Sequence, residues 1–257
     1  HGQDARIVDV VNDEVDRLRI GTGLEWKQWE QLFDHITRRV IFGNSARNDQ
    51  ELTDLLAKLM NRANRIVGGE PGDDYYEFYG RIDRYLANPD PYSLIAMVAD
   101  GPQSDRTRIA QQIPHWMFAM RDTLGANAYR ALALAASGHR DNLPGVLHEA
   151  MRLWPTTPLL AREKVDDGSQ VMILNVFNHR DPREADFNRV RPDREGSYRF
   201  NHLSNGSQDC PGGPLVMLIG TAVLEQMLST YDLRYVGPSL DPPPEMLDFF
   251  SIRFDVG

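Results

Sequence analysis

The chain has 257 residues, a mass of 29.2 kDa and 41% hydrophobic residues, which is enough for one large domain or two smaller ones. Its 37 acidic and 28 basic residues give a formal net charge of −9, which argues against nucleic acid as the main partner. The single cysteine excludes an internal disulfide framework and thiol-rich metal sites, and it is compatible with a cytoplasmic location.

The apolar stretches and the first residues bear on targeting. No stretch approaches the ~18 uninterrupted apolar residues that a membrane span requires, so we expect no membrane segment in this sequence. The first ten residues, HGQDARIVDV, have neither an initiating methionine nor the apolar core of a signal peptide. We therefore expect the sequence to begin inside a longer protein.

Apolar residues recur at helical spacing through the first hundred residues. They predict helices over residues 7–18, 26–40, 52–60, 75–86 and 92–99. Asn48 or Asp49 is the expected N-cap of the third of these helices. Residues 68–74 (GGEPGDD) form a loop that separates a short helical part from the rest of the chain.

A longer helix is predicted from about Arg106 to Ser137, because this stretch is rich in Ala and Leu and has a single proline and a single glycine. At ~1.5 Å per residue it would be roughly 45 Å long. In its middle, Asp122 and Thr123 oppose helix propensity, since both residue types favour caps and turns. They form either an exposed pair on the solvent face or a polar notch that faces a buried site.

A further helix is expected to carry Glu149 and Arg152, which would share one face and could pair there. Such pairs are common, so this pair alone has little weight. Pro155 and Pro158 should end the helix, and VMILNVF (171–177) is predicted to be a strand.

The only cysteine lies in the stretch YRFNHLSNGSQDCPGGP (198–214). Turn-forming residues surround Cys210, and the apolar run Leu215–Leu228 that follows predicts a helix. The thiol therefore precedes a helix N-terminus, where free N–H groups and the positive end of the dipole favour a thiolate. A lone cysteine is more often a small core residue, but the surrounding glycines and prolines indicate a shaped loop.

Four of these elements, taken in order over roughly residues 106–235, resemble the cytochrome P450 superfamily of haem-thiolate monooxygenases. AMRDT resembles the oxygen-activation motif of the family's long central helix, and EAMR matches its Glu-x-x-Arg motif. FNRVRPDR resembles the segment whose arginine joins that pair, and the spacing of Gly206, Cys210 and Gly212 matches the cysteine-ligand loop.

The resemblance implies a fold and an organisation for the chain. It implies a mainly α fold with small β-sheets, a long central helix, and a cysteine-ligand loop before a C-terminal helix. Residues 1–257 would form a single P450-like domain that lacks the family's N-terminal sheet and first helices.

The same resemblance implies haem b as the cofactor, with the Cys210 thiolate as the axial iron ligand. Asp122 and Thr123 would be the catalytic residues, which hold water and pass protons near the bound oxygen. Glu149, Arg152 and Arg189 would form a structural triad of buried charges. The other expected cofactor-binding positions are Arg162, as a propionate partner, with Ala119, Leu203, Gly206, Gln208 and Gly212.

Four positions depart from the family pattern. In the cysteine loop, Leu203 stands where the family has Phe, and Gln208 where it has Arg or His. Gln208 can still donate a hydrogen bond to a propionate, but without charge assistance. In the helix, Met120 replaces a small residue, and Arg121 beside Asp122 loosely resembles the peroxygenase branch, in which an arginine binds a substrate carboxylate.

The function implied is a monooxygenase that inserts one oxygen atom of O2 into an apolar small molecule. A ferredoxin-like protein or a flavoprotein reductase would donate the electrons. Two alternatives stay open: a peroxide-driven peroxygenase, indicated by Arg121, and a degenerate, non-catalytic scaffold that assists a partner enzyme, indicated by Leu203, Gln208 and the short chain.

Overall fold

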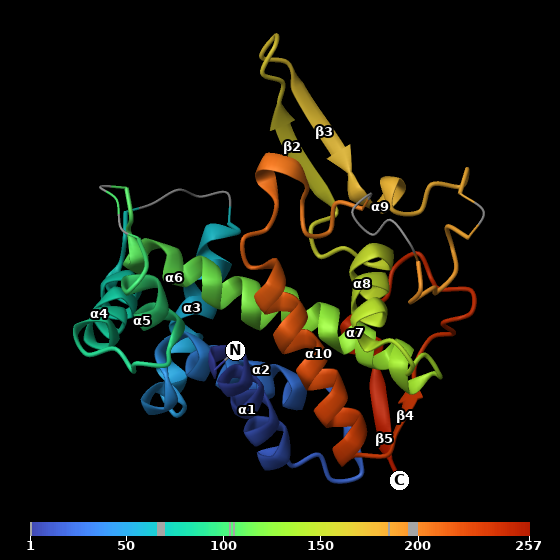
Figure 1. The fold of residues 1–257 in the computed structure, drawn as a ribbon, viewed down its shortest axis with the longest axis horizontal. Coiled ribbons are helices and arrows are strands. Elements are labelled where there is room, and N and C mark those ends of the chain that lie inside the picture. Colours follow the sequence, from blue (N-terminus) through green and yellow to red (C-terminus); the bar gives the residue numbers. More distant parts are fainter. Residues whose placement is uncertain (1, 66–69, 103, 105, 185, 195–199) are drawn as a thin grey trace. The chain divides into compact units, whose positions relative to one another are not determined.

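The computed structural model describes residues 2–65, 70–102, 104, 106–184, 186–194 and 200–257, which are mainly helical with two small antiparallel sheets (Figure 1). The residues cluster into two compact units. The first unit comprises His1–Glu14 and Glu30–Asp122, and the second comprises Val15–Trp29 and Thr123–Gly257. A single domain over residues 1–257 stays a prediction.

The first unit is helical. Its elements are most of α1 (Gly2–Arg17) and of α2 (Trp26–Phe42), a 3-10 turn η1 (Asn44–Ala46), α3 (Gln50–Ala63), α4 (Asp73–Ala87), α5 (Leu94–Ala99) and α6 (Ile109–Phe118). Asp49 is the N-cap residue of α3, although its side chain makes no capping hydrogen bond. The helices bury the apolar stripes that their spacing predicted, with fully buried side chains such as Phe33, Leu52 and Ile82.

Three successive helical segments occupy the region expected to form one long helix. These segments are α6, the π-helix η2 (Ala119–Leu124) and α7 (Gly125–Ala136). Arg121, Asp122 and Thr123 lie in the π-helix, a wide turn that is rare in proteins and is frequent at functional sites. The sequence pattern does not reveal this change of helix type, because the spacing of apolar residues over six positions hardly differs between an α-helix and a π-helix.

The second unit is built around α7, which packs against α8 (Leu143–Leu153) and α10 (Gly213–Thr230). Its three-stranded sheet has the order β1-β5-β4, formed by Gly23–Leu24, Arg253–Val256 and Leu233–Val236. A 3-10 turn, η5 (Phe249–Ser251), precedes β5. Tyr129 of α7 is fully buried, and its hydroxyl donates toward the backbone oxygens of Leu24 and Ile252, which ties the helix to the sheet edge.

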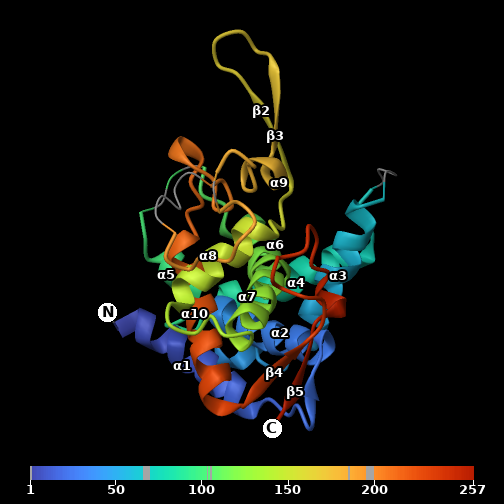
Figure 2. The same ribbon diagram turned by 90° about the vertical axis from the view of Figure 1, so that its right-hand side faces the viewer.

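A second sheet is the hairpin β2 (Leu159–Glu163) with β3 (Gln170–Leu174), paired in register from Leu159 with Leu174 to Glu163 with Gln170. Both views show the hairpin projecting beyond α8 and α9 of the same unit (Figures 1 and 2). The strand ends at Leu174, three residues earlier than predicted, because Asn175–Asn178 turn into the short helix α9. The apolar run alone could not distinguish these two conformations.

Helix α10 is the apolar helix predicted after the cysteine loop. Within the described residues, it is the one helix long and apolar enough to cross a membrane by length and composition, which no stretch was expected to be. In the fold, 39% of it is buried, and it contacts α7 and α8. The core helix of a globular protein meets the same criterion, so this finding is weak evidence for a membrane span.

Candidate functional site

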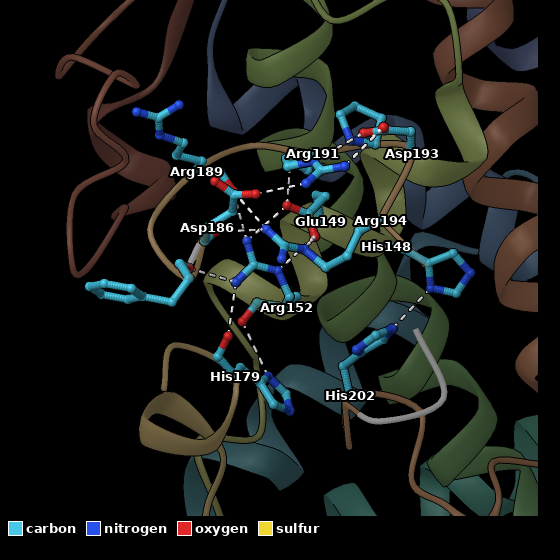
Figure 3. Close-up of polar contacts among 12 residues, drawn as sticks. His148, Glu149, Arg152, His179, Asp186, Arg189, Arg191, Asp193, Arg194 and His202 are labelled. Atoms are coloured by element: carbon cyan, nitrogen blue, oxygen red, sulfur yellow. Dashed lines mark hydrogen bonds and ion pairs between the residues drawn. The ribbon is translucent and has the colours of Figure 1, made fainter. Parts of the chain in front are cut away.

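A buried ion pair on α8 is the centre of a polar network in the second unit. Arg152 donates to Glu149 through Nε at 2.6 Å and through Nη2 at 2.8 Å, and the two side chains are 1% and 3% exposed (Figure 3). Because the residues are three apart on a helix, the two side chains share one face. The bidentate geometry gives each charge its partner although both side chains are almost completely buried.

Arg152 also binds the backbone of two later segments. Its Nη1 donates to the carbonyls of His179 and Phe187, at 2.8 and 2.9 Å, and its Nη2 donates to the carbonyl of Arg189 at 2.9 Å. One side chain thus anchors the chain after α9 and the segment from Asp186 to Arg194 onto α8. Such anchoring points to a structural role.

The remaining bonds of Glu149 come from the Asp186–Arg194 segment. The backbone N–H of Arg191 donates to Oε2 at 2.8 Å, and Nε of Arg194 donates to Oε1 at 3.0 Å. Arg189, expected to be the third charged member, contributes its carbonyl, and its side chain points away from Glu149 (Figure 3). The third charged side chain is therefore that of Arg194, which the sequence could not select from three arginines within six residues.

Gly145 on α8 allows this segment to lie close to the helix. A Cβ at this position would be 1.9 Å from the carbonyl oxygen of Pro192, so only glycine fits without moving the backbone. The side chain of Asn142 donates to the same oxygen at 2.9 Å. The contact holds Arg191 and Arg194 within reach of Glu149.

Three histidines line the same region. The backbone N–H of Asn201 donates to Nε2 of His179, so the ring proton is on Nδ1, which lies 3.1 Å from the carbonyl of Arg152. Burial lowers the pKa of His179 to about 4. His179 is therefore neutral at pH 7 and extends the network without adding a charge.

His148 and His202 form a direct imidazole pair. Nδ1 of His148 and Nε2 of His202 are 2.9 Å apart, while Nδ1 of His202 is buried without a hydrogen-bond partner (Figure 3). Burial, followed by the nearby His148, lowers the pKa of His202 to about 3, and burial also lowers the pKa of His148. The described part of the chain contains no group of three or more His, Cys, Asp or Glu side chains that could hold a metal ion.

Two cavities flank this network, with volumes of about 250 and 340 Å³, and Arg152, Arg191 and Arg194 line both. Histidine, aspartate and glutamate side chains supply much of the remaining lining. Charged walls of this kind do not suit an apolar small molecule. Neither cavity therefore provides the pocket expected for an apolar substrate.

The loop around Cys210 is shaped by its backbone. The N–H of Cys210 donates to the carbonyl of Leu203 at 2.8 Å, and the N–H of Gly213 donates to the carbonyl of Cys210 at 2.9 Å. Between them, Gly206 has φ +65°, a conformation that favours glycine, and begins the 3-10 turn η4 (Gly206–Gln208). The sequence prediction of a shaped loop directly before a helix therefore agrees with the local structure.

Cys210 itself is half-buried, three residues before the start of α10. A Cβ on Gly212 would lie 3.8 Å from its Sγ, an ordinary contact distance, so Gly212 is a direct neighbour of the sulfur. Leu203 is half-buried, whereas Gly206 and Gln208 are exposed. The loop thus presents one thiol on a hydrogen-bonded turn, which is the donor that a site with a single thiolate ligand needs.

The remaining predicted cofactor position, Arg162, lies on the β2–β3 hairpin opposite Val171. Its Nη1 donates to the carbonyl of the preceding residue, Ala161, at 2.9 Å. Its role as a propionate partner stays a prediction.

Asp122, Ala119 and Arg121 belong to the first unit, whereas Thr123 is the first residue of the longer segment of the second unit. Arg121 donates to Asp122 Oδ1 at 2.6 Å, to Asp34 Oδ1 at 2.5 Å and to Glu30 Oε1 at 3.0 Å. Burial raises the pKa of Asp122, Arg121 lowers it, and Glu30 and Asp34 raise it, with a net upward effect. Asp34 and Glu30 come from α2, and sequence reasoning gave no signal for their proximity to Arg121.

Comparisons with known proteins include a distant similarity to a curated protein. No protein-family model matches the chain. The chain is 23% identical over 192 residues to a curated Drosophila melanogaster protein described as "Probable cytochrome P450 4s3". The match covers 60% of this chain and 38% of the fly protein. The helical content and small sheets are consistent with a P450-like fold, and the similarity indicates the cytochrome P450 family at most.

Proposed function

We propose that this chain is part of a haem-thiolate monooxygenase that inserts one oxygen atom of O2 into an apolar small molecule. The observation that carries the proposal is the placement of the only cysteine, a half-buried residue, on a glycine-shaped turn directly before α10. The buried Glu149–Arg152 pair in the same unit and the distant similarity to a cytochrome P450 support it.

The residues of the loop fit the proposed cofactor in their donor chemistry. Cys210 would supply the single thiolate ligand of haem b, and Gly206 and Gly212 would let the backbone approach the sulfur. Leu203, Gln208, Arg162 and Ala119 would border the haem. When bound, a thiolate-ligated haem supplies the oxygen-activating chemistry of this enzyme class.

The other roles belong to side chains of this chain. Asp122 would exchange a proton at its carboxyl group, whose raised pKa brings that exchange closer to neutral pH. Thr123 would hold water through its hydroxyl. Glu149, Arg152 and Arg194 would keep the segment from Asp186 to Arg194 in place, and they have no chemical step of their own.

The partners and location complete the proposal. An apolar small molecule would be the substrate, and a ferredoxin-like protein or a flavoprotein reductase would be the electron donor. We also propose a cytoplasmic location.

The peroxygenase alternative would need an arginine that is free to bind a substrate carboxylate. All three nitrogens of Arg121 already donate to carboxylates of the chain. A substrate carboxylate would have to displace one of them and would meet the charge of the others. The oxygen-dependent reaction is therefore the better supported of the two.

The haem-thiolate proposal is tested with the reduced protein under carbon monoxide. We expect a strongly red-shifted Soret band that is lost in Cys210→Ala. His148→Ala is the matched control, because it removes a possible nitrogen ligand near the network and should leave the band in place. A protein that binds no haem, or a Soret band at the position typical of histidine ligation, would contradict the proposal.

A further inference from the structure

Arg121 connects Asp122 to two carboxylates on a different helix. Asp34 and Glu30 are four residues apart on α2, so their side chains share a face of that helix. Arg121 binds Asp34 through Nε, Glu30 through Nη2 and Asp122 through Nη1. The guanidinium thus divides its donors between the π-helix and α2.

The charges of this cluster do not cancel. One guanidinium faces three carboxylates, an excess of two negative charges, with Arg121 and Asp34 12% and 5% exposed. Glu30 and Asp122 are each 38% exposed. Asp34 has further support, since Gln50 of α3 donates to its Oδ2 at 3.3 Å and the Arg38 cation lies nearby. The two α2 carboxylates therefore compete with Asp122 for the same cation and also repel its charged form.

The cation itself stays charged in this environment. Burial opposes the charge on Arg121, but Asp34, Asp122 and Glu30 raise its pKa above the ordinary value. The adjustable member of the cluster is Asp122, because its pKa is raised by burial and by Glu30 and Asp34, and is lowered by Arg121. Removing Arg121 should therefore raise the pKa of Asp122, whereas removing Glu30 or Asp34 should lower it.

We propose that Arg121 is the positioning residue of Asp122, and that Asp34 and Glu30 control how readily the Asp122 carboxyl gains and loses a proton. The inference rests on the proposed function, in which Asp122 exchanges protons. It adds that α2 sets the charge state of that group. A substitution on α2, outside the motif of the π-helix, then alters the proton exchange.

The experiment is a pH titration of the Asp122 carboxyl by carbon-13 NMR. It uses the full chain, reduced and saturated with carbon monoxide so that any bound haem is diamagnetic, and Asp122→Asn assigns the signal. We expect Arg121→Gln to raise the pKa of Asp122 by about 1. Asp34→Asn and Glu30→Gln should each lower it, because each removes a repelling charge and frees a donor of Arg121.

Glu30→Gln and one control variant make the result decisive. Glu30→Gln changes a half-exposed side chain, so it keeps the test valid if Asp34→Asn does not fold. Glu77→Gln on α4 is the matched control, since it removes an exposed carboxylate paired with Arg81 and should leave Asp122 unchanged. An Asp122 pKa that is the same in Arg121→Gln, Glu30→Gln and the unaltered chain would overturn the inference.

The titration tests the inference about Asp122, and the carbon monoxide spectrum tests the proposed function, so their outcomes are independent. If Asp122 does not respond while the thiolate band is present, the inference is wrong and the proposed function stands. If Asp122 responds as expected and the band is absent, the cluster is as described and the monooxygenase proposal is wrong.

Discussion

Arg152 and Arg121 both bind carboxylates, yet their surroundings differ. Arg152 is 1% exposed, pairs with one carboxylate and gives its remaining donors to backbone carbonyls. Arg121 is 12% exposed and gives its donors to three carboxylates, two of them partly open to water. The first arrangement is balanced in charge and fixes the backbone, while the second has excess negative charge that the binding of a proton reduces. The difference indicates a structural role for Arg152 and control of the protonation of Asp122 for Arg121.

The largest effect is expected from the removal of Arg152, the arginine whose charge is balanced by a single carboxylate. Arg152→Ala leaves the buried Glu149 with fewer donors and releases three backbone carbonyls, so we expect a loss of ~3–5 kcal/mol in the free energy of unfolding. Urea denaturation followed by circular dichroism measures it. Arg183→Ala is the control, because Arg183 is 88% exposed and pairs at the surface with Asp181, so no measurable change is expected. Equal effects of the two substitutions would contradict the structural role.

The pH dependence of stability tests the same network through His179, which is neutral in the folded chain at pH 7. His179 has a pKa of about 4 in the folded chain, below its ordinary value of 6.5, so the unfolded chain binds the proton first as the pH falls. Stability should be constant above about pH 6.5 and should fall by about 3 kcal/mol between pH 6.5 and 4 from this residue alone.

Denaturation midpoints across that pH range measure the loss. His179→Asn should make the profile flatter, whereas His115→Gln, at an exposed position on α6, should leave it as steep as in the unaltered chain. A flat profile in the unaltered chain would show that the histidine is not held neutral.

The smallest expected effect distinguishes two neighbouring arginines. Arg194→Ala removes a charged donor from Glu149 and two bonds to backbone carbonyls, for a loss of about 2 kcal/mol. Arg189→Ala should change stability by less than about 0.5 kcal/mol, since its contribution is a backbone carbonyl that alanine retains. Denaturation of both variants under the same conditions measures the difference, and the reverse order would restore Arg189 as the third charged member.

Several features of the site could be predicted from local sequence. The pairing of Glu149 with Arg152 follows from their spacing on a helix, and the turn around Cys210 follows from its glycines, prolines and asparagine. The end of β3 at Leu174 and the π-helical turn at Ala119–Leu124 could not be predicted, because the same apolar run is compatible with either conformation. Arg194 could not be chosen over Arg189, since the choice depends on how the backbone curves past Gly145.

The sequence by itself determined the helices, the pairing of neighbours along them and the single thiol before α10, because these depend on interactions between residues close in the chain. The tertiary structure decided which groups distant in the chain meet. It brought Asp34 and Glu30 of α2 to Arg121, and Arg194 to Glu149, at separations of 45 to 91 residues. Such contacts depend on how the helices pack, so they cannot be predicted from local sequence. The resulting charge pairs then determine which carboxyl group can change its protonation.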